Sequence, residues 1–397
     1  MAALEGSPER HHRLSAVRRE GERVTPLELF FDLVFVLAIT QCTALMSHEQ
    51  TWSGLAQGLL ILGVLWWAWV GYAWLTSVID PEAGVVRIVI FAAMAAMLIV
   101  SLCVQEAFGN LALTFALAIG VYRTAHIVLF WLAGADDRDL RRSVVGLAVS
   151  TAVAVGILIV ASLFDGFAQG ALWALAIFLD MAGPYFFGSE GWKLVPGHFA
   201  ERHGLIVIIA LGESIVAIGV GASGALDLGI GTAAVLGIFL TAALWWTYFD
   251  VVALISARRL GEAEAGRAQN ELARDSYSYV HLLLVAGIVL MALGMKVTIG
   301  HTDEHLHDVP AFALLGGLAV YLLGLVAFRY RHVQTLNRSR LGLAIVLLFL
   351  VPVATSMAAL ITLAVAVVLI WGLIVVEHRR YGSRREELRR EASAAHS

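Results

Sequence analysis

The chain has 397 residues, of which 59% are hydrophobic and 15% charged, and its mean hydropathy is +0.81. Soluble domains are about 45–50% apolar and about 25% charged, so this composition excludes a soluble globular domain and indicates an integral membrane protein. The formal net charge of −4 says little as a total, because the placement of charges decides the topology of a membrane protein.

Apolar runs long enough to cross a bilayer recur along the whole chain. A bilayer core about 30 Å thick needs about 20 apolar helical residues. We predict about twelve spans, the last two separated only by Pro352 and the polar pair Thr355-Ser356. They lie near 26–46, 54–77, 87–104, 111–133, 143–164, 168–187, 204–222, 229–256, 277–299, 309–328, 341–355 and 357–376. The expected fold class is an all-α integral membrane protein.

Lysine and arginine residues gather in alternate loops. They occur in both tails and in the loops around 138–142, 193–202, 258–274 and 329–340, whereas the opposite loops contain none. Because positively charged loops stay on the cytoplasmic side, we expect the N and C termini in the cytoplasm. The polar first 24 residues do not fit a cleavable signal, which makes the first span an uncleaved anchor of a multi-pass inner (plasma) membrane protein.

The second part of the chain repeats features of the first. "LWWAWVGYAWLTS" (65–77) resembles "LWWTYFDVVALIS" (244–256), and "FFDLVFVLAI" (30–39) aligns with "LGESIVAIGV" (211–220). Matches in a common order predict a six-plus-six parallel repeat, whose halves are related by an axis along the membrane normal. The expected divisions are a cytoplasmic tail 1–24, a first repeat 25–188, a second repeat 189–376 with a cytoplasmic connector 257–276, and a basic cytoplasmic tail 377–397.

Two acids stand near the start of the first span. Thr25 suits a helix N-cap and Pro26 the first helical turn, which places Glu28 near the membrane interface and Asp32 about one turn deeper. An ionised carboxylate within hydrocarbon costs about 2.5–3.5 kcal/mol even on the lenient insertion scale. Asp32 therefore requires a partner, water or a proton.

Other spans also carry ionisable side chains. Arg123 and His126 are three residues apart and share a helix face. Asp180 lies in the sixth span, and Glu213 precedes Ser214 in the seventh. Counting from the helix starts puts Asp32, Arg123, Asp180 and Glu213 at depths where they could meet. Two interpretations stay open: a satisfied ion-pair network that fixes helix register, and an ion or proton pathway.

The segment "HFAERHG" (198–204) precedes the seventh span on the expected cytoplasmic side. We predict that Glu201, Arg202 and His203, together with Glu28, form an inner gate, with His203 giving protons access to Glu213 through water or Asp180. The alternative is an interfacial anchor with a positive-inside arginine.

An aromatic stretch marks the second and eighth spans. Trp66, Trp67, Trp69 and Trp74, like Trp245 and Trp246 in the eighth span, are expected in an interfacial belt or facing lipid. Nothing in the chain resembles an ATP-binding loop, a serine nucleophile elbow or a Cys-rich metal centre. We therefore expect no enzyme activity, no cofactor and no metal site. The expected partners are membrane lipids and an unidentified small solute or ion, with no nucleic acid, and oligomerisation is left open.

The stretches "RVTPLELFFDLVFVLAITQ" (23–41) and "HFAERHGLIVIIALGESIVAIG" (198–219) resemble the bacterial low temperature requirement protein A family, LtrA. The resemblance implies a multi-pass inner-membrane protein linked by name to growth in the cold. It marks as motif positions, without assigning them chemistry, Asp32, Glu201, Arg202, His203, Glu213 and Ser214. A looser similarity connects the chain to potassium channels of two six-helix repeats whose first helix carries a Phe-Ser-Asp motif. Here Phe30-Phe31-Asp32 stands at that motif, and the second repeat has Gly212-Glu213-Ser214.

The leading functional hypothesis is a secondary transporter, with proton coupling as an option, whose site lies between the halves around Asp32, Arg123, Asp180 and Glu213. The alternatives are a passive cation channel between the first and seventh spans, and a membrane protein with a structural or lipid-related role.

Overall fold

The computed structural model describes residues 23–135, 137–186, 191–223 and 227–394. Within these ranges the chain is helical and forms no strand. Eleven helical segments of this part are long and apolar enough to cross a membrane, which confirms an all-α multi-pass membrane protein. Residues 1–22 of the predicted N-terminal tail lie outside the described residues.

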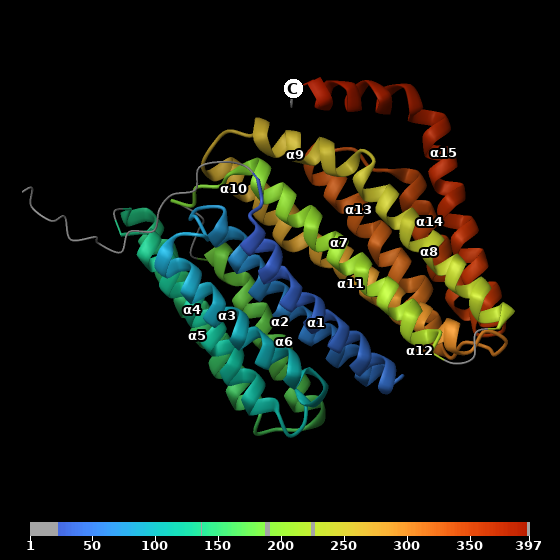
Figure 1. Cartoon of the computed structure of the whole chain (residues 1–397), viewed down its shortest axis with the longest axis horizontal. Coiled ribbons are helices and arrows are strands. Elements are labelled where there is room, and N and C mark those ends of the chain that lie inside the picture. The colour runs from blue at the N-terminus through green and yellow to red at the C-terminus, as the bar shows by residue number, and fades with distance from the viewer. Residues whose placement is uncertain (1–22, 136, 187–190, 224–226, 395–397) are drawn as a thin grey trace, which may run out of the picture.

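The helices follow one another with short connections (Figure 1). Up to residue 186 they are α1 (Pro26–His48), α2 (Trp52–Thr76), α3 (Gly84–Cys103), α4 (Ala112–Ala133), α5 (Arg138–Ala161) and α6 (Gly166–Phe186). After residue 190 they are α7 (Pro196–Gly221), α8 (Leu228–Phe249), α9 (Val252–Glu262), α10 (Arg267–Ala273), α11 (His281–Gly300), α12 (Asp308–Ala311), α13 (Gly317–Val333), α14 (Arg338–Ala354) and α15 (Ala359–Ala394). A 3₁₀ turn, η1 (Val104–Glu106), follows α3, and the π-helical segments η2 (Arg274–Val280) and η3 (Phe312–Gly316) precede α11 and α13.

The structure differs from the twelve predicted spans at α14. This helix has 17 residues, about 25 Å at 1.5 Å per residue, which is shorter than a hydrocarbon core of about 30 Å. It nevertheless packs against α13 and α15. The beginning of α1 and the end of α15 lie on the same side of the bundle (Figure 1), as an even number of crossings requires. The described part of the chain thus has eleven helical segments long enough to span a membrane and, among them, the shorter α14.

The first helix begins where the sequence predicts. Thr25 Oγ1 accepts a hydrogen bond from the Glu28 N–H at 3.3 Å, and the Glu28 carboxylate accepts one from the Thr25 N–H at 2.9 Å. This reciprocal capping box, with Pro26 in the first turn, fixes the start of α1. The side chain of Glu28 is only 1% exposed, so it is buried among other side chains at the start of α1.

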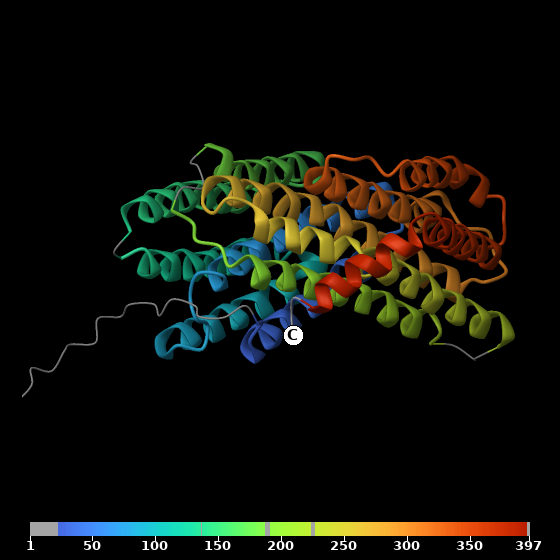
Figure 2. The ribbon, with the colours of Figure 1, turned by 90° about the horizontal axis from the view of Figure 1, so that it is seen from above.

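The two parts of the chain occupy opposite ends of the longest dimension, with α1 and α7 between them (Figure 2). The first helix packs on α2 and α3 of its own part and also on α7 and α11 of the other. Helix α1 therefore makes the main contact between the two parts of the chain.

Helix neighbours in the two parts follow a similar order. Helix α1 packs on α2 and α3 as α7 packs on α8 and α11. Further along, α3 packs on α4 and α4 on α5, as α11 packs on α13 and α13 on α14. A six-plus-six parallel repeat would produce this pattern. The repeat and its boundaries at 188 and 376 stay predictions.

The tryptophans of α2 are not where the sequence analysis expects them. Trp66, Trp67, Trp69 and Trp74 are between 1% and 8% exposed, so the expectation of a belt or lipid-facing position is wrong for this helix. Helix α2 is covered on several sides by α1, α4, α6, α7 and α11, which leaves its aromatic side chains no lipid to face. The tryptophan pair of α8 agrees better with the expected belt or lipid-facing position, because Trp245 is 45% exposed.

Close backbone contact joins α11 to the helical segment opposite. A Cβ atom at Gly294 would lie 2.4 Å from the backbone nitrogen of Leu314, and one at Gly287 would lie 2.6 Å from that of Tyr321. No side chain fits at such distances. Small residues of this kind allow membrane helices to approach until their backbones touch.

Candidate functional site

Four charged or ionisable side chains join α1 to α7. Glu28 and Asp32 are four residues apart on α1, as His198 and Arg202 are on α7, so each pair occupies one helix face. Arg202 Nη2 donates to Asp32 Oδ1 at 2.8 Å, and His198 Nε2 is hydrogen-bonded to Glu28 Oε1 at 2.8 Å. Arg202 Nη1 lies 3.3 Å from Glu28 Oε1. None of these side chains is more than 1% exposed, so the α1–α7 network is sealed from water and lipid.

Helix α2 completes the α1–α7 network. Trp69 Nε1 donates to Asp32 Oδ1 at 2.9 Å, and the Arg202 guanidinium lies 5.6 Å from the centre of the Trp69 ring. Ser77 Oγ is hydrogen-bonded to His198 Nδ1 at 3.0 Å. A buried carboxylate is tolerated when it is paired and hydrogen-bonded. Asp32 therefore has the partner that its depth requires, although its Oδ2 atom accepts no hydrogen bond.

The predicted gate residues have different surroundings. Glu28 and Arg202 belong to the α1–α7 network, whereas Glu201 is exposed and accepts a hydrogen bond from the Val24 N–H at 3.1 Å. His203 is fully buried, and its Nδ1 donates to the Phe199 carbonyl at 2.8 Å. Its ring lies 5.0 Å from that of Trp69, among aromatic side chains and His281. This position does not suit a residue that meets cytoplasmic water.

A second buried ion pair lies within the first part of the chain. Arg123 Nη2 on α4 lies 3.0 Å from Asp180 Oδ2 on α6. Thr151 on α5 accepts from Arg123 Nη2 at 2.7 Å and donates to Asp180 Oδ1 at 3.2 Å. The pair therefore ties three helices together, and the side chains of Arg123 and Asp180 are 4% and 15% exposed.

Glu213 and Ser214 lie elsewhere. Thr40 Oγ1 on α1 donates to Glu213 Oε2 at 2.5 Å, while the buried Ser214 Oγ has no partner among the described residues. Glu213 is about 16 Å along α7 from Arg202 at 1.5 Å per residue. No hydrogen bond in the described part of the chain joins Asp180 to His203 or Glu213. The expectation that the buried charges form one cluster is wrong, because they are divided among three sets of partners.

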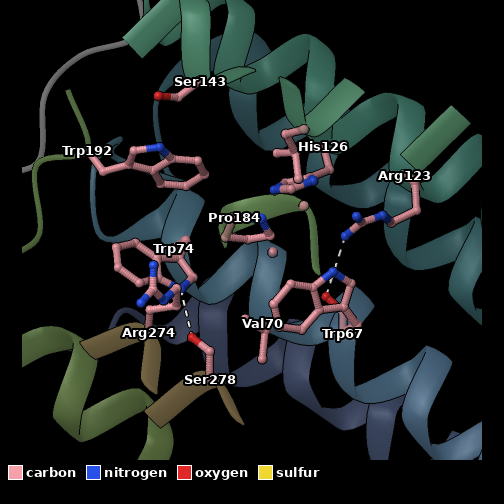
Figure 3. A pocket seen from close by; sticks show the side chains of 13 residues that line it. Trp67, Val70, Trp74, Arg123, His126, Ser143, Pro184, Trp192, Arg274 and Ser278 are labelled. Atoms are coloured by element: carbon pink, nitrogen blue, oxygen red, sulfur yellow. Dashed lines mark hydrogen bonds between the residues drawn. The ribbon is translucent and has the colours of Figure 1, made fainter. Parts of the chain in front are cut away.

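A cavity of about 50 Å³ lies beside Arg123, and a second of about 20 Å³ shares Arg123 and Trp67 with it. Figure 3 shows the larger one from close by, with side chains from α2, α4, α5, α6 and η2 around it. Its polar lining includes His126, so the prediction that Arg123 and His126 share a face is confirmed. Asp180 lines the smaller cavity.

Local backbone features make room for the cavity. Pro184 interrupts α6 and has no N–H to give to the carbonyl of Asp180, one turn earlier. Gly71 on α2 lets the His126 ring approach, since a Cβ atom there would lie 2.7 Å from His126 Cε1. The π-helical η2 supplies Arg274 and Ser278 to the lining. Interruptions of this kind are common where membrane helices surround a functional cavity.

Sequence analysis missed one buried pair completely. Arg340 on α14 donates through Nε and Nη2 to the two carboxylate oxygens of Glu377 on α15, both at 2.9 Å, and through Nη1 to the Thr247 carbonyl at 3.2 Å. The sequence pattern places Arg340 in a loop and Glu377 in the C-terminal tail. The signal was available, since both residues stand at the ends of apolar runs on the same side.

The described residues contain no group of three or more His, Cys, Asp or Glu side chains that could hold a metal ion.

Comparison with known proteins gives a family. The family model of the bacterial low temperature requirement A protein (LtrA) matches residues 23–375. A protein of Rhizobium meliloti (strain 1021), described as uncharacterized protein RA0937, is 29% identical over 374 residues, covering 89% of this chain and 90% of the relative. No solved structure matches. Since the family model spans nearly all of the membrane helices and both motif stretches, the chain belongs to the bacterial low temperature requirement A (LtrA) family.

Proposed function

We propose that this protein is a secondary transporter whose substrate site is the larger cavity beside Arg123 and Asp180, and that Asp180 couples transport to protons. The observation that carries the proposal is an ion pair inside a membrane protein with cavities against it. Ionisable groups in spans usually mark substrate or proton pathways. An ion pair that only fixes helix register needs no cavity beside it. The cavity beside Arg123 therefore favours an ion or proton pathway over a purely structural ion pair.

Both cavities lie along the C-terminal half of α2. The larger extends between Trp74, near the end of this helix, and Trp67, and the smaller continues from Trp67 to Gly63. Arg123 lines both, while its carboxylate partner lines only the second. A solute moving along α2 would pass Arg123 and compete with Asp180 for its guanidinium. A displaced Asp180 would take up a proton, because an unpaired carboxylate is costly in this surrounding.

The proposed site replaces the one expected between the two halves. Asp32 belongs to the α1–α7 network, which we propose is the contact about which the two parts of the chain move. We also propose that the protein lies in the inner (plasma) membrane with both tails in the cytoplasm, which is supported by the arginine-rich alternate loops.

Reconstituted liposomes test the transport proposal. Purified protein is inserted into liposomes that contain the pH dye pyranine, and small solutes are added outside while internal pH is followed. We expect solute-dependent proton uptake in wild type and its loss in Arg123→Gln/Asp180→Asn, which removes both charges together. The matched control is Arg340→Gln/Glu377→Gln, which removes the other buried Arg–carboxylate pair and should retain uptake. Proton uptake that is equal in wild type and the Arg123/Asp180 variant would contradict the proposal.

A passive cation channel between α1 and α7 is the competing function. The two helices are neighbours, but a pore between them must separate Arg202 from Asp32, and both side chains are 0% exposed. Ohmic single-channel currents in planar bilayers would favour the channel, whereas a transporter gives none.

A further inference from the structure

The larger cavity contains hydrogen-bonding groups that have no partner among the described residues. Neither ring nitrogen of His126 makes a hydrogen bond of normal geometry there, and the Gly71 backbone lies near the ring, although the side chain is 1% exposed and projects among the lining residues (Figure 3). In the same part of the chain Arg123 Nε and Trp192 Nε1 also lack partners, and both residues line the same space. A buried polar group without a partner costs about 1–3 kcal/mol. Several such groups around one cavity indicate that something polar fills it.

The charged residues that line the cavity decide whether its occupant is an anion or a cation. Arg123 and Arg274 both line the cavity, and no aspartate or glutamate does. Their carboxylate partners are bound outside this lining: Asp180 holds Arg123 at 3.0 Å, and Asp275 holds Arg274 at 2.8 Å. The cavity therefore receives the positive member of each pair. An anion gains from both guanidinium groups, whereas a cation meets no carboxylate.

The volume of the cavity limits the size of its occupant. A cavity of about 50 Å³ exceeds the roughly 10–15 Å³ that a single water requires and the roughly 30 Å³ that a water occupies in the liquid. It therefore suits an occupant larger than one water, such as an anion of three or four heavy atoms. Its oxygens would accept from Arg123 Nε, Trp192 Nε1 and a protonated nitrogen of His126.

We propose that the larger cavity binds a small oxyanion of the size of formate, nitrate or acetate, held by Arg123, His126 and Trp192. Any part that this anion plays in transport rests on the proposed function, whereas the binding site itself is inferred from the geometry of the cavity. When the anion binds, Arg123 exchanges Asp180 for it, and Asp180 takes one proton from water on the loading side. One negative and one positive charge then move together, and both are released on the other side.

Anion binding is measured on the full chain purified in detergent. Sodium formate, nitrate and acetate are titrated at constant ionic strength, with sodium gluconate as the balancing salt because gluconate is too large for the cavity. The readouts are tryptophan fluorescence, since Trp67, Trp74 and Trp192 line the space, and the folding equilibrium in denaturant. At tenfold excess over Kd, a ligand specific to the folded state raises that equilibrium constant about elevenfold. We expect a saturable response to at least one of the three anions and none to gluconate.

Variants separate the site from general salt effects. His126→Phe keeps an aromatic ring at this position and removes no permanent charge, so it should fold, and it should weaken anion binding at least tenfold. Arg123→Gln/Asp180→Asn should abolish binding. Arg340→Gln/Glu377→Gln should keep wild-type affinity, because Arg340 is fully bonded beside a cavity of only about 10 Å³.

The outcomes distinguish this inference from the transport proposal. No saturable response to any of the three anions, or a response that His126→Phe retains, would overturn the anion site. Anion binding without anion-driven proton uptake in liposomes would overturn transport and leave the site intact. Proton uptake driven by other solutes, without anion binding, would overturn only the anion site.

Discussion

Asp32 on α1 and Arg202 on α7 are separated by 170 positions in the chain and by 2.8 Å in the structure. Neither side chain is exposed. Removing one member of such a pair leaves the other charge buried, which costs about 3–5 kcal/mol, whereas removing both is often nearly neutral.

We expect Asp32→Asn to destabilise the protein by about 3 kcal/mol, the lower end of that range, because Glu28 still lies 3.3 Å from Arg202 Nη1. Asp32→Asn/Arg202→Gln should recover most of the loss. Unfolding titrations in mixed detergent micelles measure both values. A single variant as stable as wild type, or a double variant less stable than the single, would contradict the pairing.

The close contact at Gly294 predicts a stability difference between two glycines. Gly294→Ala places a methyl group 2.4 Å from the Leu314 nitrogen, and overpacking of this kind costs about 1–3 kcal/mol. Gly212→Ala is the control, since no atom lies within 4 Å of its added Cβ atom, and its effect should stay within about 0.5 kcal/mol. The same unfolding titration compares them, and equal stability of the two variants would argue against the α11 contact.

Asp137, which precedes α5 outside the spans, predicts a pH dependence. Its Oδ1 accepts from the Leu140 N–H at 3.2 Å and its Oδ2 lies 3.1 Å from Lys193 Nζ, and these contacts lower the pKa of its carboxyl. A lowered pKa means that the ionised group stabilises the fold above the unfolded value of about 3.9, and that this contribution disappears as pH falls through the folded pKa.

We expect Asp137→Ala to cost about 1 kcal/mol near pH 7 through the lost helix cap. Asp137→Asn should keep the cap and lose only the pH-dependent part, so that its stability converges with that of wild type as pH falls from about 3.9 through the lowered folded pKa. Unfolding midpoints between pH 7 and pH 3 measure this. Parallel wild-type and Asn curves over the whole range would exclude a role for the charge.

Thiol labelling tests the membrane orientation. The native Cys42 and Cys103 are 0% and 3% exposed and should not react with a membrane-impermeant maleimide. Asp303→Cys, in the loop without lysine or arginine, should react in intact cells, whereas Arg258→Cys should react only in inverted vesicles. The reverse pattern would invert the predicted topology.

Helix positions followed from the sequence because they depend on local features. The capping box at Thr25 and Glu28 fixed the start of α1, and the length of the apolar runs located most spans. At α14 the apolar run after Leu341 continues almost without a break, and only Pro352 and the polar pair Thr355-Ser356 mark where it divides.

Partner choice could not be predicted in the same way. Asp32, Asp180 and Glu213 are acids within apolar stretches of helix, and which partner each meets depends on how the helices rotate about their axes. A helix such as α2, apolar nearly all round, gives no stripe to set that rotation. One pairing was nevertheless within reach. Glu28 and Asp32 are four residues apart, as are His198 and Arg202, and the two helices cross in the same direction. The first acid can therefore face the first base and the second acid the second base.

The separation of 170 positions between Asp32 and Arg202 also constrains how the protein is made. At about 5–20 residues per second, a ribosome completes α1 roughly 7–30 s before it reaches α7. Throughout that interval the first helix carries two acids whose basic partners, His198 and Arg202, have not yet been made. The insertion machinery must therefore hold α1 out of free lipid, or tolerate it in a protonated form, until the seventh helix arrives, and a nascent chain released earlier would be a substrate for membrane proteases.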